Sequence, residues 1–165
     1  MVMGSLENDI LEILNHNSKI TPEEIAVMLD IETQEVKDII AKLEENNTIV
    51  KYNTLINWDK TDRECVTALI EVKVTPQRDL GFDAIAERIY HFPEVKSVYL
   101  MSGAYDLCVM VEGKTMKDVA FFVAQKLSVL DTVLSTATHF VLKAYKLEGI
   151  ILEDNEEDSR EVISL

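Results

Sequence analysis

A short segment around Gly103 carries residues whose types suit the binding of a small charged molecule. Gly103 and Ala104 are small, so a ligand can approach the backbone there, and backbone amides can donate to a carboxylate. Asp106 can accept from an ammonium group, and the two poles together suit a zwitterion. The alternative is an ordinary hairpin turn in which Asp106 caps its own backbone. The candidate residues are Ser102, Gly103, Ala104, Tyr105 and Asp106.

Two threonines near the end of the chain form a second candidate group. Thr136 and Thr138 are two positions apart in a segment of strand-like alternation, so their hydroxyls lie on the same side of a strand. The alternative is that both threonines are there because β-branched residues favour strands.

A third group lies on and after the helix expected from residue 33. Thr33, Gln34, Lys37 and Lys42 occupy positions outside its apolar stripe, and Lys51 follows the helix. In a recognition helix, Gln34 would contact bases, while Lys37, Lys42 and Lys51 would contact phosphates. The residue types therefore predict contact with the major groove of double-stranded DNA.

The charge balance weakens that prediction. The formal net charge of the 165-residue chain is −14. Residues 1–60 hold five lysines, no arginine and twelve acidic residues, which gives −7. Phosphate binding depends on Lys and Arg, so DNA contact must come from a local patch and is expected to be weak per site. The alternative is a retained fold that does not bind DNA.

Other chemistry is not indicated. Cys65 and Cys108 form no CxxC motif, and the three histidines (His16, His91 and His139) have no metal-ligand spacing. No catalytic residue, metal or cofactor is therefore predicted. No apolar run approaches the length of a membrane span, and the N-terminus lacks a signal-peptide pattern. We expect a cytoplasmic protein without a membrane partner.

The first third of the chain has helical periodicity. Apolar spacing predicts helices over residues 6–14, 22–29 and 33–46. Thr21 and Glu24 form a capping-box pattern at the start of the second helix, which is expected to bury Ile25, Met28 and Leu29. Three helices with a short second one indicate a helix-turn-helix. Residues 49–52 and 54–56 are expected to form a small hairpin, or wing, and residues 58–63 a linker containing Trp58.

The second part alternates between strand and helix patterns. Strands are predicted over residues 66–74, 95–101, 106–111 and 133–146, with helices over 82–90 and 116–130. The order βαββαβ predicts a ferredoxin-like sandwich, so the fold class is α+β. The predicted domains are a winged helix-turn-helix (1–57), a linker (58–64), an effector and dimerisation domain (65–146) and an acidic tail (147–165).

The predicted sheet has a face that no helix covers, and that face should be polar if it meets water. Cys108 and Met110 alternate with Leu107, Val109 and Val111, so both faces of this strand are apolar. A second copy of the sheet is the simplest cover, and we therefore expect a homodimer.

The order of these elements resembles the Lrp/AsnC (leucine-responsive, feast/famine) family of transcription regulators. The most specific segments are residues 100–107 (LMSGAYDL), the Thr136-Ala137-Thr138 strand and the stretch at 49–52. The resemblance implies dimerisation through the sheets, further assembly to octamers, and amino-acid effectors held between subunits. It also places Thr136 and Thr138 beside the glycine turn across a subunit boundary. Family members carry arginines where Ile39 and Ala41 stand in this chain.

Three functions compete at this point. The first is a regulator whose effector resets the placement of its subunits and of paired recognition helices. The second is a sensor of the same fold that does not bind DNA. The third is an enzyme, since some haem-pathway decarboxylases resemble this architecture. Those need a His–Arg cluster, which Arg63, Arg78, Arg88 and Arg160 do not suggest.

Overall fold

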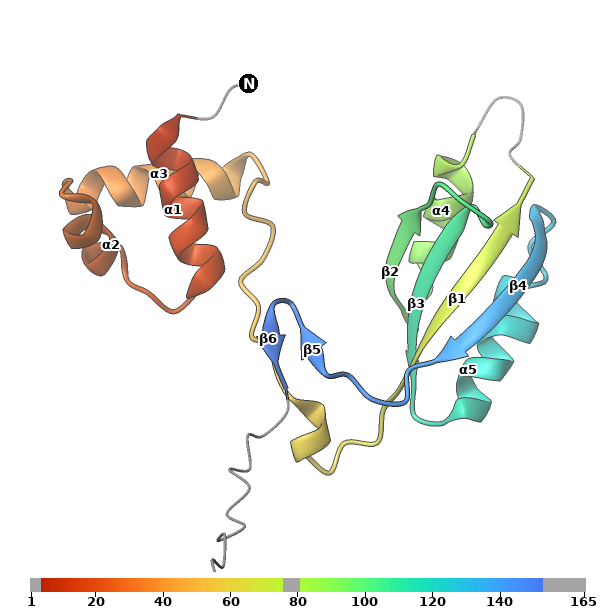
Figure 1. Ribbon diagram of the computed structural model, residues 1–165. Helices are drawn as coiled ribbons and strands as arrows, with labels where there is room; N and C mark the ends of the chain where they lie inside the picture. Colours follow the sequence, from red (N-terminus) through yellow and green to blue (C-terminus); the bar gives the residue numbers. More distant parts are fainter. Residues whose placement is uncertain (1–3, 76–80, 153–165) are drawn as a thin grey trace, which may run out of the picture. The chain divides into compact units, whose positions relative to one another are not determined.

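The computed structural model describes residues 4–75 and 81–152 of the chain. The chain divides into two compact units, Met1–Ile56 and Asn57–Leu165, which we call the N-terminal and C-terminal units (Figure 1). Of the predicted acidic tail, residues 153–165 lie outside the described part of the chain.

The N-terminal unit is the predicted three-helix arrangement. It consists of α1 (Ser5–His16), α2 (Pro22–Leu29) and α3 (Thr33–Glu45). The predicted capping box begins α2: the Thr21 hydroxyl accepts from the Glu24 amide, and the Glu24 carboxylate accepts from the Thr21 amide at 2.8 Å. Asp30 then takes a left-handed conformation (φ 54°), which turns the chain tightly into α3. Apolar residues from all three helices pack into one core: Ile10, Leu14, Ile25, Ala26 and Val36.

Two expectations for this unit are wrong. Met28 is 62% exposed, because the buried side of α2 is formed by Ile25 and Ala26 instead. The wing is not a hairpin, since the described residues 46–57 contain no strand. Only Asn53 separates the two predicted strands, which is fewer than the two residues that the tightest common hairpin loops need.

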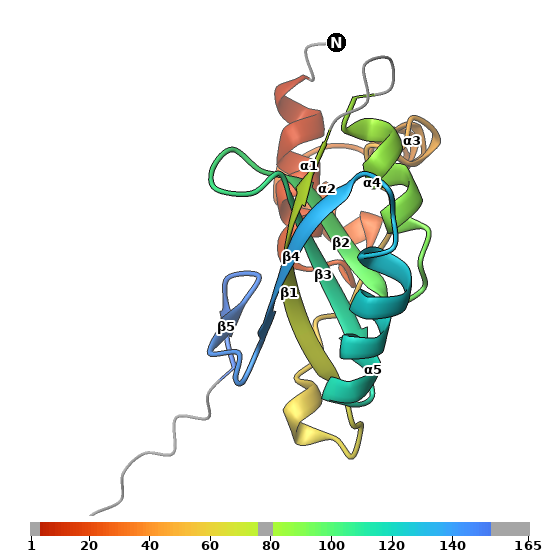
Figure 2. The same ribbon diagram turned by 90° about the vertical axis from the view of Figure 1, so that its right-hand side faces the viewer.

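The C-terminal unit is a four-stranded antiparallel sheet with helices on one face. Its elements follow the predicted order: β1 (Val66–Val74), α4 (Asp83–Tyr90), β2 (Val95–Leu100), β3 (Leu107–Gly113), α5 (Met116–Phe122), and β4 (Val133–Phe140). The strand order is β2-β3-β1-β4, and Figure 2 shows α4 and α5 on the same side of the sheet. This arrangement confirms the ferredoxin-like α+β fold.

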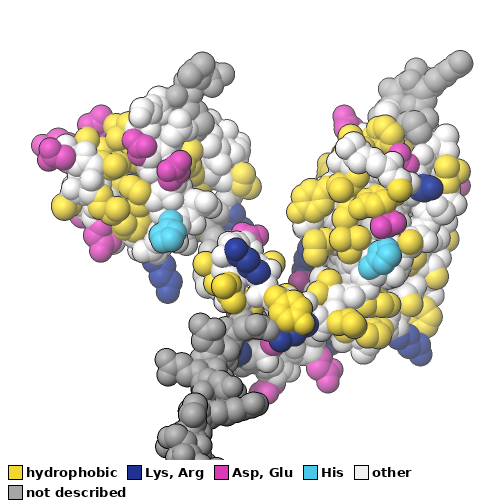
Figure 3. All heavy atoms as spheres, viewed as in Figure 1, with side chains coloured by type: hydrophobic (Ala, Val, Ile, Leu, Met, Phe, Trp, Pro, Cys, Tyr) yellow, Lys and Arg dark blue, Asp and Glu magenta, His cyan; other side chains and the backbone are white. Residues whose placement is uncertain are grey.

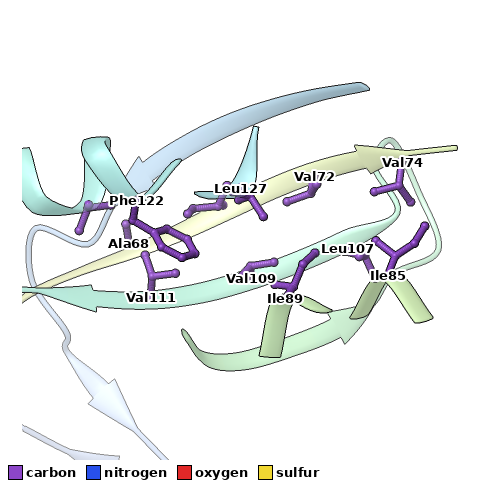
Figure 4. Packing of buried hydrophobic residues seen from close by; sticks show 12 residues of the cluster. Ala68, Val72, Val74, Ile85, Ile89, Leu107, Val109, Val111, Phe122 and Leu127 are labelled. Atoms are coloured by element: carbon purple, nitrogen blue, oxygen red, sulfur yellow. The ribbon is translucent and has the colours of Figure 1, made fainter. Parts of the chain in front are cut away.

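The main core lies between the sheet and these two helices. Alternate residues of the central strands point into it and meet Ile85 and Ile89 of α4 and Phe122 of α5 (Figure 4). Each fully buried aliphatic side chain of this kind contributes about 1.5–3 kcal/mol relative to exposure. The strand residues of this core are Ala68, Ile70, Val72, Val74, Leu107, Val109 and Val111.

The structure differs from the predicted elements at several ends. The last strand stops at Phe140 rather than residue 146, and a short hairpin of β5 (Lys146–Leu147) and β6 (Ile150–Ile151) follows. The Val141 amide donates to the Thr67 carbonyl, and Thr67 is near the start of β1, so β4 ends where its partner strand ends. The α5 helix continues as one π-helical turn (Val123–Leu127), and the predicted linker contains the 3-10 turn η1 (Trp58–Lys60).

The other face of the sheet is not covered by a helix, and we call it the open face. Strand register places Leu69 of β1 beside Met110 of β3, and Cys108 of β3 beside Tyr99 of β2. Figure 3 shows hydrophobic side chains gathered over this sheet. Charged side chains border them: Glu71 lies 3.4 Å from His139, and Glu112 of β3 lies 3.4 Å from both Lys96 and Arg63. The open face is therefore largely apolar in its middle, as the alternation of residues predicted.

Candidate nucleic-acid and effector sites

The exposed side of α3 carries the predicted DNA-contacting side chains. Val36 and Leu43 are buried, and Ile39 and Ile40 pack on the core, which fixes the helix by its apolar stripe. Gln34, Lys37 and Lys42 lie on the exposed surface, while Thr33 is half-buried at the first turn. Because Ile39 packs inward, it is not a surface position in this chain.

Each of the three exposed polar side chains contacts a carboxylate. Gln34 Nε2 donates to Asp38 Oδ1 at 2.9 Å, one turn along the same helix. The Nζ of Lys37 lies 2.7 Å from Glu23 Oε1 of α2. The Nζ of Lys42 lies 2.7 Å from Glu7 Oε1 of α1. The lysines hold the pKa of the Glu23 and Glu7 carboxyls below the ordinary value, mainly by hydrogen bonding.

These acidic partners were not found by sequence reasoning. The Gln34–Asp38 spacing is visible in the sequence, because side chains four residues apart share a helix face. The other two contacts join residues of different helices, so only the packing of α1 and α2 against α3 reveals them.

The segment after α3 is tied back to the helix by Tyr52. The phenol of Tyr52 donates to Glu44 Oε1 at 2.8 Å. Partial burial and this hydrogen bond raise the pKa of Tyr52 to about 12, so the phenol keeps its proton at neutral pH. Its neighbour Lys51 is exposed in an extended segment that no strand partner holds.

The glycine turn joins β2 to β3. Ser102, Gly103 and Ala104 are exposed, and Tyr105 and Asp106 are half-buried. Gly103 has a φ of 156°, which L side chains rarely adopt. Figure 2 shows the turn projecting to the side of the sheet away from α4 and α5, which is the side of the open face.

Asp106 is anchored to the central strand. Its carboxylate Oδ2 accepts from the Val74 amide at 2.9 Å, and its own amide donates to the Val72 carbonyl at 3.1 Å. The Asp106 carboxylate therefore bonds to β1 and does not cap the backbone of its own turn, which was the alternative considered from the sequence. One carboxylate oxygen accepts from β1, and no residue in the described part of the chain hydrogen-bonds to the other.

The two threonines lie away from this turn within one chain. Register pairs Thr136 with Val72 and Thr138 with Ile70, so both point to the helix-covered side. Strand β1 separates β4 from β3, which puts their backbones about 10 Å apart. The structure thus gathers the five turn residues at one end of the sheet but does not bring Thr136 and Thr138 to them.

The two cysteines belong to neither candidate site. Cys65 and Cys108 are both free thiols. Within residues 4–75 and 81–152, no cluster of His, Cys, Asp and Glu has the arrangement of a metal site. Nor does any helix in that part of the chain have the length and hydropathy needed to cross a bilayer.

Comparison with known proteins agrees with both halves of this description. Residues 5–50 match the family model described as winged helix-turn-helix DNA-binding, and residues 67–151 match that of the Lrp/AsnC ligand binding domain. The HTH-type transcriptional regulator YugG of Bacillus subtilis is 54% identical over 165 residues, covering 99% of each chain.

Solved structures share the fold. E. coli AsnC matches with a TM-score of 0.70 and 17% identity, over 89% of this chain and 97% of that one. A transcriptional regulator of Neisseria meningitidis, solved as its L-Met complex, matches with a TM-score of 0.71 and 21% identity, over 88% and 94%.

A helix-turn-helix unit followed by a ligand-binding sandwich defines a transcription regulator of the HTH type. The extent of the matched residues and the 54% identity to YugG specify the family. The chain belongs to the Lrp/AsnC family.

Proposed function

We propose that this regulator binds double-stranded DNA through α3 and is controlled by an amino acid bound between two copies of its C-terminal unit. The observation that carries the effector part is the placement of the candidate residues. The turn 102–106 projects to one side of the sheet, and Thr136 and Thr138 point to the other. A site using both groups therefore needs a second copy of the chain.

The turn offers complementary poles for an amino acid. Backbone amides around Gly103 and Ala104 donate to the α-carboxylate, and the Asp106 carboxylate accepts from the α-ammonium group. Ser102 and Tyr105 supply hydroxyls beside it. Thr136 and Thr138 point to the helix-covered side, so they are proposed to come from a copy in a neighbouring dimer and not from the copy that covers the open face. The L-Met complex of the Neisseria regulator, which has the same fold, supports an amino acid as the ligand class.

A dimer partner is proposed to cover the open face. Leu69, Met110 and Tyr99 are too apolar to be favoured in water, and an identical sheet covers them symmetrically. Further assembly of such dimers, up to an octamer, would place several N-terminal units on one DNA molecule. Avidity then compensates for weak contact by each unit.

The DNA contacts are assigned by position on α3. Gln34 reaches base edges, Thr33 lies at the first turn, and Lys37, Lys42 and Lys51 contact phosphates. By linkage, an amino acid that favours one arrangement of the copies changes the affinity for DNA, and DNA changes the affinity for the amino acid by the same factor.

A thermal-shift screen of the twenty amino acids tests the effector site. A ligand at about 100 times its Kd stabilises the folded state by about 2.7 kcal/mol. We expect one amino acid or a small group to raise the Tm of the wild type, and Asp106→Asn to abolish the rise. Asparagine retains an acceptor for the Val74 amide, so the fold is kept while the charge is lost.

The matched control is Asp62→Asn, an exposed residue that lies before the start of β1. It makes the same change of charge and should keep the ligand-induced shift. A shift that persists unchanged in Asp106→Asn would place the ligand elsewhere.

A second function has one observation in its favour. The acidic N-terminal unit, in which Lys37 and Lys42 are paired with glutamates, is also what a sensor that has lost DNA binding would show. A gel shift with the DNA upstream of the protein's own coding sequence separates the two. Binding that weakens as salt is raised supports the regulator, and no binding at low salt supports the sensor.

A further inference from the structure

Two carboxylates contact the lysines through which α3 is proposed to bind DNA phosphates. Lys37 and Lys42 are the two lysines on the exposed side of this helix, and both are in ion pairs with other helices. Gln34, the proposed base-reading side chain, is bonded to Asp38. Before DNA binds, each of these three side chains therefore already contacts an acidic side chain.

The pair of Lys42 with Glu7 is the better fixed of the two. The side chain of Glu7 is only 19% exposed, and its second oxygen accepts from the Gly4 amide at 3.0 Å in the capping box of α1. The carboxylate is thus held at both oxygens, by the start of its own helix and by Lys42. In the other pair, Lys37 and Glu23 have side chains 48% and 59% exposed, so that pair is open to solvent.

Such a pair opposes DNA binding in two ways. The lysine must leave its carboxylate, or share its charge between carboxylate and phosphate. The carboxylate also remains near the phosphate, and like charges at close range repel each other. In water these effects are modest for each exposed pair, but they act on two of the three lysines proposed to contact phosphates.

We infer that Glu7 and Glu23 set the DNA affinity of α3 by holding Lys42 and Lys37 in intramolecular ion pairs that duplex DNA must displace. The two glutamates act as built-in competitors of phosphate. This inference rests on the proposed binding of DNA by α3. It makes weak binding a property of two identifiable side chains rather than of the overall net charge.

The test compares Glu7→Gln, Glu23→Gln and the double variant with the wild type, by fluorescence anisotropy on mixed-sequence duplex DNA over a salt series. Glutamine keeps an acceptor for the Gly4 amide, so the start of α1 is preserved. We expect Kd to fall about 3-fold for each single change and about 10-fold for the double variant at low salt, with a steeper salt dependence.

The control for charge alone is Glu12→Gln, an exposed residue of α1 that makes no ion pair with α3 in the described structure. It should change Kd by less than about 2-fold at the same ionic strength. Circular dichroism of every variant checks that the helices are retained.

A double-mutant cycle shows whether the effect passes through the lysine. In a Lys42→Gln background, Glu7→Gln should have no more effect than Glu12→Gln, because the competing pair no longer exists. If Glu7→Gln and Glu23→Gln bind like Glu12→Gln while the wild type binds DNA, the inference is wrong and the proposed function stands. If neither the wild type nor any variant binds at low salt, both are wrong.

Discussion

Asp106 stabilises the fold, in addition to its proposed contact with the ligand. Its carboxylate holds the end of β1 through the Val74 amide, so replacing it affects stability as well as binding. We expect Asp106→Ala to lower the free energy of unfolding by about 1–3 kcal/mol, because a partly buried amide loses its acceptor.

Urea denaturation of the ligand-free protein measures this change. Asp106→Asn should lower the free energy of unfolding by less than half as much as Asp106→Ala. Equal losses in the two variants would show that the hydrogen bond to Val74 is not what the carboxylate contributes.

Acidic residues of the N-terminal unit predict a loss of stability at low pH. The pKa values of Glu7, Glu23 and Glu24 lie below the ordinary 4.5 in the folded chain, through hydrogen bonds from Lys42, Lys37 and Thr21 respectively. A carboxyl with a depressed folded pKa stabilises the fold above its unfolded pKa, and this contribution is lost as pH falls through the folded value.

Helical circular dichroism followed through heating at a series of pH values tests the sign. The Tm of the wild type should fall below pH 4.5. The Tm of the Glu7→Gln, Glu23→Gln double variant should fall less over the same range. A double variant with the same decline as the wild type would rule out these two pairs as the source.

At the scale of elements, local signals located the helices and failed for strands whose pairing is not local. Thr21 and Glu24 predicted the start of α2, and the helix predicted over residues 33–46 ends one residue earlier, at Glu45. The long last strand was wrong because a strand persists only while it has a partner to bond, and the sequence does not state where the partner ends. The wing was wrong for a local reason, since the single residue Asn53 is too short a hairpin loop.

The capping box of α2 gives an element-scale prediction. Thr21→Ala removes the acceptor of the Glu24 amide and should lower the free energy of unfolding by about 1 kcal/mol. Thr54→Ala, in the extended segment after α3, is the control and should change it little. Urea denaturation followed by circular dichroism compares the two, and equal destabilisation would contradict a role for the cap.

Some features of the candidate sites could be predicted from the sequence, and others depend on tertiary packing. The turn around Gly103 was predicted from residue types, since its small residues and its aspartate lie within five consecutive residues, and its role with an effector stays a prediction. The carboxylate partners of Lys37 and Lys42 were missed because their neighbourhood is created by helix packing. The prediction that Thr136 and Thr138 meet the turn across a subunit boundary stays a prediction, since within one chain β1 lies between them and the turn.

At the scale of the whole molecule, the account depends on pairing of the open face. An acidic chain of net charge −14 repels its own copies, so the apolar area around Leu69 and Met110 must outweigh that repulsion. In the proposed function, pairing forms the dimers whose further assembly completes the effector site. It also joins N-terminal units whose individual contacts with DNA are expected to be weak.

Sedimentation velocity of the full chain at physiological ionic strength tests this most directly. The wild type should sediment as a dimer or a larger assembly. Leu69→Glu, which puts a charge in the open face, should shift it toward the monomer, while Val129→Glu, at an exposed position outside that face, should not. A wild type that remains monomeric at high protein concentration would contradict the account.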